Sequence, residues 1–229
     1  MKAGQQKFPR LEILPDAQMR LWPELAEVPD QFILYGDTAI ALHLGHRQSV
    51  DFGFFAFEDI DLGAISDQFT FLNGGRVLQK GPNSLTLLVD RGGPVQVSFF
   101  GVPKLRHLHP PLCAPDNCLQ IADLLDLVGT KAAVVQKRAE AKDYIDLDAL
   151  IVDGGISLPM ALSAAAYLYG PSFNPEITLK ALSYFGDGNV ASMPADVRDR
   201  LLGAVKAVDL DALPPVQTES EHDNLRGSP

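Results

Sequence analysis

The pattern of the sequence changes near the middle of the chain, and this change limits the folds that it can adopt. Up to about Pro111, short β-type runs alternate with helical segments, and Gly and Phe are frequent. Beyond Leu119, almost every segment follows a helical period and is rich in Ala and Leu. Pro110, Pro111 and Pro115 predict a linker or long loop between the two parts. We therefore expect an α+β fold, with a mixed sheet and flanking helices followed by a C-terminal helical bundle packed on the sheet.

These patterns place the domain boundaries and the elements. We expect an α/β domain at residues 1–118, a helical domain at 119–213 and a disordered tail at 214–229, where no apolar period is found. Strands are expected at residues 31–35, 50–57, 76–79, 84–89 and 95–100. Helices are expected after Asp37 and at residues 62–72, 122–138, 141–152, 158–169, 176–185 and 195–208.

The composition excludes several classes of protein. The net charge is −10, from 19 Lys and Arg against 29 Asp and Glu, which argues against broad nucleic-acid binding through a basic surface. No apolar run approaches the roughly 20 residues of a membrane span, and the polar segment Met1–Lys7 lacks the core of a signal peptide. Cys113 and Cys118 are the only cysteines, too few for a disulfide framework or a zinc cluster. We expect a cytoplasmic protein.

The segment from Tyr35 to Phe55 carries the clearest chemistry. A strand ends at Gly36, a helix follows, and the next strand brings Asp51 close to the start of that helix. Free N–H groups at a helix start favour a phosphate, and a carboxylate on a neighbouring strand can hold Mg²⁺ that bridges this phosphate. Taken alone, a Gly before a helix is more often only a tight turn. His43 and His46 flank Gly45 without a third metal ligand.

This segment resembles the signature of the nucleotidyltransferase fold, and in particular of the AbiEii/AbiGii-type toxin family. In that family, a Gly-Gly-Thr-Ala-Leu helix start is followed by Gly-His-Arg-x-Ser-x-Asp-x-Asp. The matching residues are Gly36, Thr38, Ala39, Leu42, Gly45, His46, Arg47, Ser49 and Asp51. Residues 123–147 resemble the helical Lys…Arg…(Arg/Lys)-Asp-x-x-Asp motif of the family, and 95–100 and 181–185 resemble two further segments. The resemblance covers about residues 25–210.

The resemblance implies transfer of a nucleotide from an NTP, with Mg²⁺, to an RNA or protein hydroxyl. It further implies the toxin half of a bacterial toxin–antitoxin or abortive-infection system, with tRNA or a protein as acceptor, a cognate antitoxin as partner and no membrane. The implied catalytic residues are Asp51, as the metal ligand, with Lys131 and Asp143. The residues implied around the nucleotide are Gly36, Asp37, Thr38, Arg47, Ser49 and Lys142.

The chain departs from the family pattern at three positions. Asp37 replaces the second glycine, Gly53 replaces the second aspartate of Asp-x-Asp, and Ser98 lies where many nucleotidyltransferases have a third carboxylate. A single carboxylate holds Mg²⁺ weakly, and the charge of Asp37 opposes an approaching triphosphate. We therefore expect impaired catalysis. Other acids have simpler roles, because the pair Asp59 and Asp61 is expected to cap a helix and Asp90 to form a turn.

Two alternatives stay open for the helical half. Lys131 and Arg138 are seven residues apart and would share a face of one helix, with Asp143 and Asp146 on one side of the next. They either form a basic wall for the triphosphate, with Asp143 orienting it or acting as a base, or ion pairs that tie helices together. His107 and His109, in the Pro-rich joint, are expected to contact solvent.

Two rival functions also stay open. The first is a catalytically inactive member of the same fold that binds a nucleotide, RNA or a partner protein, which the missing carboxylate at Gly53 favours. The second is a small-molecule modifier akin to antibiotic nucleotidyltransferases. If nucleotide binding survives removal of Mg²⁺, basic groups of the protein bind the phosphate. If metal chemistry persists in this chain, binding should instead require the ion.

Overall fold

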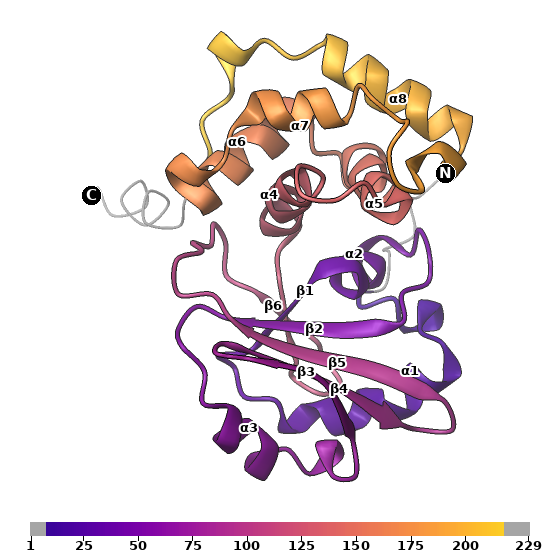
Figure 1. The fold of residues 1–229 in the computed structure, drawn as a ribbon, viewed down its shortest axis with the longest axis vertical. Coiled ribbons are helices and arrows are strands. Elements are labelled where there is room, and N and C mark those ends of the chain that lie inside the picture. Colours follow the sequence, from indigo (N-terminus) through magenta and orange to yellow (C-terminus); the bar gives the residue numbers. More distant parts are fainter. Residues whose placement is uncertain (1–7, 218–229) are drawn as a thin grey trace, which may run out of the picture. The chain divides into compact units, whose positions relative to one another are not determined.

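A computed structural model of the chain describes residues 8–217, and these residues form two compact units (Figure 1). The first, here called the sheet unit, contains the residues up to Lys104 and the segment Pro111–Ala122. The second, the helical unit, contains Leu105–Pro110 and the residues from Asp123 onward. Most of the tail expected at 214–229, from residue 218 onward, lies outside the described residues.

The sheet unit is built on a mixed sheet of seven strands in the order β3-β4-β5-β2-β1-β7-β6. The pairs β2–β5 and β1–β7 are parallel, and the other neighbours are antiparallel. The strands are β1 (Ile33–Tyr35), β2 (Asp51–Ala56), β3 (Arg76–Gly81), β4 (Ser84–Asp90), β5 (Pro94–Gly101), β6 (Leu112–Cys113) and β7 (Gln120–Ile121). The expected mixed sheet is therefore confirmed, and each strand predicted from the sequence lies within two residues of its expected bounds.

The two faces of β2 have different roles because successive side chains of a strand point to opposite faces. Phe52 and Phe54 are fully buried, and the ring of Phe52 lies 6.3 Å from that of Trp22, also buried. Asp51 and Gly53 occupy the other face. Of the helices of this unit, α2 (Gly36–Leu44) lies on one side of the sheet, and α1 (Asp16–Leu21) and α3 (Leu62–Gln68) lie on the other (Figure 1).

The Pro-rich joint was expected to be a linker or long loop, and this expectation is wrong in part. Residues 112–113 and 120–121 form β6 and β7, which extend the sheet beyond β1. The turn between them is held by long-range bonds, because the indole N–H of Trp22 donates to Asp116 (2.8 Å) and the side-chain amide of Asn117 donates to the backbone O of Trp22 (2.9 Å). Strands of two residues carry too little periodicity to be predicted locally.

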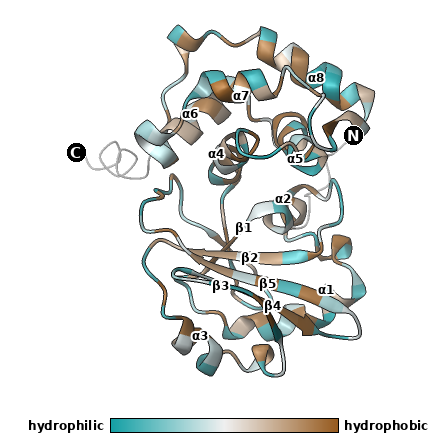
Figure 2. Cartoon of the chain, in the orientation of Figure 1, coloured by the Kyte–Doolittle hydropathy of each residue, from teal (hydrophilic) through white to brown (hydrophobic). Residues whose placement is uncertain are grey.

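The helical unit contains α4 (Leu124–Val134), α5 (Ala141–Val152), α6 (Leu158–Tyr169), α7 (Pro175–Ala181) and α8 (Ala195–Lys206). The bounds expected for α5 and α6 are confirmed. Helix α4 crosses α6 closely at Gly129, where a Cβ atom would lie 2.7 Å from Leu168 Cδ1 and 3.0 Å from the backbone of Ala164. Helix α8 carries hydrophilic and hydrophobic residues in alternation (Figure 2), with Val197 and Leu201 buried.

Helices α3, α4 and α7 each end four residues before the expected bound, and α8 ends two residues before it. Helix α4 was expected to reach residue 138 and α7 residue 185, but they end at Val134 and Ala181. The chain beyond each of these residues continues as turns. Along the described part of the chain, no helix has the length and hydrophobicity that crossing a bilayer would require.

Candidate functional site

The site expected in the sheet unit begins where β1 passes into α2. Tyr35 is extended, and Gly36 then has a φ of +75°, in the left-handed region that favours glycine. No atom lies within 4 Å of a Cβ built on Gly36, so the glycine is required by its backbone conformation and not by crowding. This turn starts a helix of nine residues whose first N–H groups have no partner within the helix.

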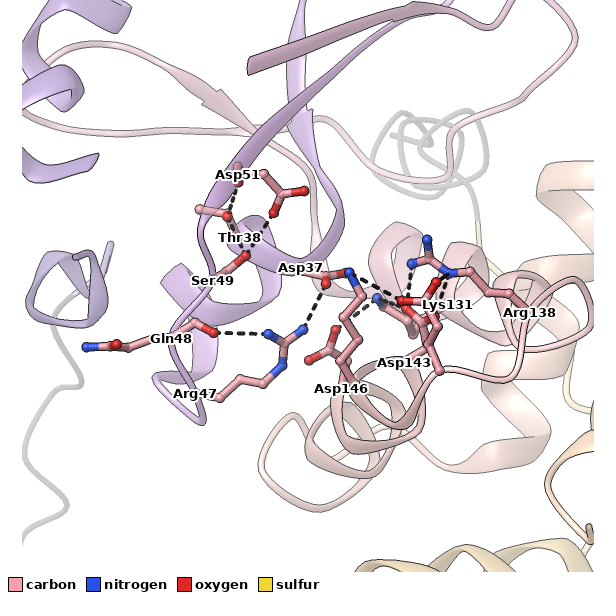
Figure 3. Close-up of polar contacts among 12 residues, drawn as sticks. Asp37, Thr38, Arg47, Gln48, Ser49, Asp51, Lys131, Arg138, Asp143 and Asp146 are labelled. Carbon is pink, nitrogen blue, oxygen red and sulfur yellow. Dashed lines mark hydrogen bonds and ion pairs between the residues drawn. The ribbon is translucent and has the colours of Figure 1, made fainter. Parts of the chain in front are cut away.

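Three of the expected site residues form one hydrogen-bonded cluster (Figure 3). The hydroxyl oxygens of Thr38 and Ser49 lie 2.8 Å apart, and Thr38 also makes a short hydrogen bond to the backbone O of Asp51. The Ser49 hydroxyl lies 3.3 Å from Asp51 Oδ1 and donates to it. Thr38 and Ser49 are buried, whereas Asp51 is half-buried. The cluster therefore joins the start of α2 to the start of β2 and orients the Asp51 carboxylate.

Asp37, at the position of the missing glycine, is paired with a cation of the same unit. The guanidinium of Arg47 lies 2.9 Å from its carboxylate, and Arg47 also donates to the backbone O of Gln48 (3.0 Å) (Figure 3). Both charged side chains are largely buried. Arg47 therefore offsets the negative charge of Asp37 at the start of α2.

The positions expected to carry further carboxylates are close neighbours on the sheet. Gly53 is paired with Tyr35 on β1 and with Ser98 on β5. A Cβ atom on Gly53 would meet only the backbone O of Tyr35, at 3.9 Å, so a larger residue has room there. The Ser98 hydroxyl accepts a hydrogen bond from Thr86 (3.0 Å). Asp51 therefore has no carboxylate neighbour at either of these two positions.

The second group of expected residues lies in the helical unit and centres on Lys131. Its ammonium lies 2.9 Å from Asp143 and 2.8 Å from Asp146, and both carboxylates are fully buried (Figure 3). Arg138 donates to both oxygens of Asp143, at 2.7 and 2.9 Å. Lys142 is paired with Glu140 at 3.5 Å. The two acids do lie on one side of α5, as expected.

The expectation that Lys131 and Arg138 share one helix is wrong. Helix α4 ends at Val134, and Arg138 lies in the turns that follow. The two cations still meet at Asp143, because the turn brings Arg138 back toward the start of α5. Of the two alternatives for this region, the observed contacts are those of a buried ion-pair network that joins α4 to α5.

Other polar residues have structural partners. Asp61 accepts bonds from the N–H groups of Gly63 (2.8 Å) and Ala64 (3.2 Å), and Asp90 accepts from two N–H groups of its turn, as expected. Asp59 was also expected to cap α3, but its carboxylate instead accepts from the side-chain amide of Asn83. His109 is partly exposed to solvent, as expected, and its Nδ1 also lies 3.0 Å from Asp123.

The segment that carries His109 is held by a buried carboxylate. The N–H groups of Leu108 and His109 donate to Asp126, at 2.9 and 3.0 Å. Burial raises the pKa of Asp126, and these two bonds lower it in part.

Gln18 of α1 belongs to the site and was missed by sequence reasoning. Its buried amide lies between two backbone groups and satisfies both when its nitrogen faces Ser49 O (2.5 Å) and its oxygen accepts from Asp51 N (3.1 Å). This orientation is assigned from the partners. No local pattern indicates this contact, because Gln18 lies about 30 residues before Asp51 in the chain.

Replacing Gln18 with Leu is expected to lower the free energy of unfolding by about 1–3 kcal/mol, because two buried backbone groups lose their partner. Urea denaturation of the variant and of the native chain would measure this difference. A Met19→Leu variant, changed at an exposed neighbour, is the control and should unfold like the native chain. A Gln18→Leu variant as stable as the native chain would contradict the assigned contacts.

Comparisons with known proteins give a matching family, a related sequence and solved structures with a similar fold. Residues 20–218 match the family described as "Nucleotidyl transferase AbiEii toxin, Type IV TA system". An uncharacterized protein of Aquifex aeolicus is 31% identical over 164 residues, which are 69% of this chain and 75% of that protein. Among solved structures, a protein of H. pylori described as a nucleotidyltransferase has a TM-score of 0.52 at 16% identity, covering 82% of this chain and 90% of its own. MenT4, a nucleotidyltransferase toxin of Mycobacterium tuberculosis, has a TM-score of 0.55 at 16% identity, covering 85% and 83%.

Proposed function

This chain belongs to the AbiEii nucleotidyltransferase toxin family, and we propose that its sheet unit binds the triphosphate of an NTP between the start of α2 and Asp51. The cluster of Thr38, Ser49 and Asp51 carries this proposal, because it joins the Asp51 carboxylate to the start of a helix, where N–H groups favour a phosphate. Gly36 supplies the turn that opens the helix toward the ligand. The proposed reaction transfers a nucleotide to an RNA or protein hydroxyl, in the cytoplasm where NTPs are abundant.

The oxygen donors of the sheet unit suit one Mg²⁺ that arrives with its nucleotide. This ion is usually held by one or two carboxylates, by substrate phosphates and by several waters. Asp51 provides one carboxylate, and Ser49 keeps it oriented. Two ions held by the protein alone would need the carboxylates that Gly53 and Ser98 lack. When bound, Mg²⁺ would neutralise charge on the transferring phosphate.

The protein groups have separate proposed roles. The first N–H groups of α2 bind phosphate oxygens, and Arg47 lowers the repulsion that Asp37 would exert on them. In the helical unit, Asp143 is fully buried and its carboxylate is engaged by Lys131 and Arg138, so we do not assign it the role of a base. We assign Asp143 the role of orienting Lys131, and Lys142 the role of a weaker contact to the nucleotide.

The biological partners are also part of this proposal. As a toxin-like nucleotidyltransferase, the chain would use an NTP as substrate, would modify tRNA or a protein, and would be countered by a cognate antitoxin. A second function, nucleotide or RNA binding without transfer, is favoured by one observation, the absence of a carboxylate at Gly53. The two functions differ in whether a nucleotide is transferred from the NTP to an acceptor.

Replacing Asp51 with Ala is expected to reduce nucleotide transfer by at least about 100-fold, because it removes a group that stabilises charge on the transferring phosphate. The assay follows label from each of the four α-labelled NTPs, with Mg²⁺ or Mn²⁺, onto bulk tRNA and onto the protein itself. Asp67→Ala, which removes an exposed carboxylate of the same unit, is the matched control and should stay active.

The outcomes separate the two functions. Transfer by the native chain that is lost in Asp51→Ala supports the proposed reaction. Absence of transfer from the native chain, together with NTP binding that persists in EDTA, would favour binding without transfer. Equal transfer by the native chain and Asp51→Ala would show that the reaction does not take place at the site around Asp51.

A further inference from the structure

A groove of about 400 Å³ lies in the helical unit, and none of the residues that line it is assigned above to NTP binding. Its walls come from the turns after α4, from the start of α5 and from α7 with the residues that follow it. The groove exists because α4 and α7 both end early, at Val134 and Ala181. A volume of this size falls in the range of small-ligand sites.

The charge of the groove is opposite to that of the whole chain. Lys137, Arg138 and Lys180 line it, against one acid, Asp187, while the chain carries a net charge of −10. Arg138 is engaged by Asp143. Lys137 and Lys180 are exposed, and neither forms an ion pair with a carboxylate among residues 8–217. Two unneutralised ammonium groups therefore face one small volume.

The position of Lys137 is fixed by an aromatic contact. Its ammonium lies 5.8 Å from the centre of the Tyr169 ring, within the range of cation–π attraction. Lys137 keeps its charge in this contact and is exposed, so it is available to an anion.

The same groove presents apolar and aromatic surface. The Tyr184 side chain is 60% exposed, and Ile177 beside it is 46% exposed. Gly186 leaves space for the Tyr184 ring, since a Cβ there would lie 2.5 Å from its hydroxyl oxygen. Tyr144 is buried, and its hydroxyl lies 3.4 Å from the backbone O of Ala181, to which it donates. An exposed aromatic face next to cations is the arrangement on which proteins stack a base and bind its phosphate.

We propose that this groove binds a nucleoside 5′-monophosphate unit, either as a free mononucleotide or as the end of a single-stranded RNA. The base stacks on Tyr184, and the phosphate lies between Lys137 and Lys180. The proposal stands independently of nucleotide transfer, because every residue that carries it lies in the helical unit and none is assigned to the NTP.

Binding is measured on the full chain in EDTA, so that no metal-dependent transfer contributes. The probes are AMP, by calorimetry, and a 5′-phosphorylated hexa-adenylate with a 3′ fluorophore, by anisotropy. For the oligonucleotide, the double variant Lys137→Ala/Lys180→Ala is expected to weaken binding at least about tenfold and to reduce the salt slope by about 1.4, the value for two phosphate contacts on a single strand. Lys206→Ala, which removes an exposed lysine of α8, is the control and should bind like the native chain.

The aromatic contact is tested separately. Tyr184→Ala is expected to weaken binding about 5- to 100-fold, the range for loss of one base–aromatic stack. Tyr184→Phe keeps the ring and should bind within a factor of two to three, on the order of the context dependence of such contacts. A further measurement needs no variant. Saturating AMP should protect Lys137 and Lys180 of the native chain from chemical acetylation, which mass spectrometry detects, with Lys206 as the unprotected reference.

The outcomes identify the source of the nucleotide. If both probes bind and their binding depends on the two lysines, the proposal is supported and both sources remain open. If only AMP binds in this way, the ligand is a free mononucleotide. If only the oligonucleotide does, the ligand is an RNA end. Absence of binding, or binding unaffected by the lysine and tyrosine changes, would overturn the proposal. Loss of binding in Asp51→Ala would overturn it too, because it would place the nucleotide in the sheet unit. Failure of this groove leaves the label-transfer result unchanged.

Discussion

Replacing Gly53 with Asp is expected to raise nucleotide transfer by about 100-fold, the size of effect seen when a group that stabilises transition-state charge is added or removed. Gly53 lies two residues after Asp51 on β2, so a side chain there points to the same face. A Cβ at this position meets no atom closer than the backbone O of Tyr35, at 3.9 Å. The added carboxylate therefore enters an existing space and completes the Asp-x-Asp pair that favours binding of divalent metal.

Label transfer by the native chain and by Gly53→Asp, run side by side, measures this effect. Gly53→Asn is the matched control, because it has nearly the same size without the charge and should behave like the native chain. The double variant Asp51→Ala/Gly53→Asp should be inactive. A gain of the same size in Gly53→Asn would show that charge is not the cause, and no gain in Gly53→Asp would mean that more than this carboxylate is missing.

Replacing Lys131 with Met is expected to lower the free energy of unfolding by about 3–5 kcal/mol, the cost of removing one partner from a buried ion pair. The ammonium lies within 3 Å of both Asp143 and Asp146, and neither carboxylate is exposed to solvent. Arg138 remains beside Asp143, but Asp146 loses its ion pair with Lys131. A buried carboxylate without such a partner is costly, so α4 and α5 would be held less firmly.

Urea denaturation followed by circular dichroism measures the loss. Lys142→Met is the control on the same helix pair, because its ion pair with Glu140 is half-exposed and 3.5 Å long, and it should cost less than about 1 kcal/mol. Asp146→Asn in the Lys131→Met background should restore part of the stability. A Lys131→Met variant that loses less than the Lys142→Met control would show that the buried network does not hold these helices.

The elements that depend on neighbouring residues were predictable. The Phe-rich run at residues 50–57 predicted the strand β2, and the structure shows that Phe52 and Phe54 are on its buried side. The bounds of α5 and α6 followed from apolar periodicity and from helix starts such as Ser157, which caps α6. Gly36 was read correctly as the turn between a strand and a helix, and Asp61 as a cap, because both roles depend on the residues next to them.

What the tertiary structure decided involves residues far apart in the chain. Two-residue strands such as β7 form only because Ile121 pairs with Leu34, and Gln18 reaches Asp51 from another element. The pairing of Arg47 with Asp37 and the early end of α4 were likewise decided by the tertiary structure. Local propensity is worth tenths of a kcal/mol per residue, whereas a buried ion pair or a completed sheet edge is worth several, so long-range contacts override it. The sequence therefore determined the fold class and the residues of the motif, and the tertiary structure decided which charged residues pair with one another.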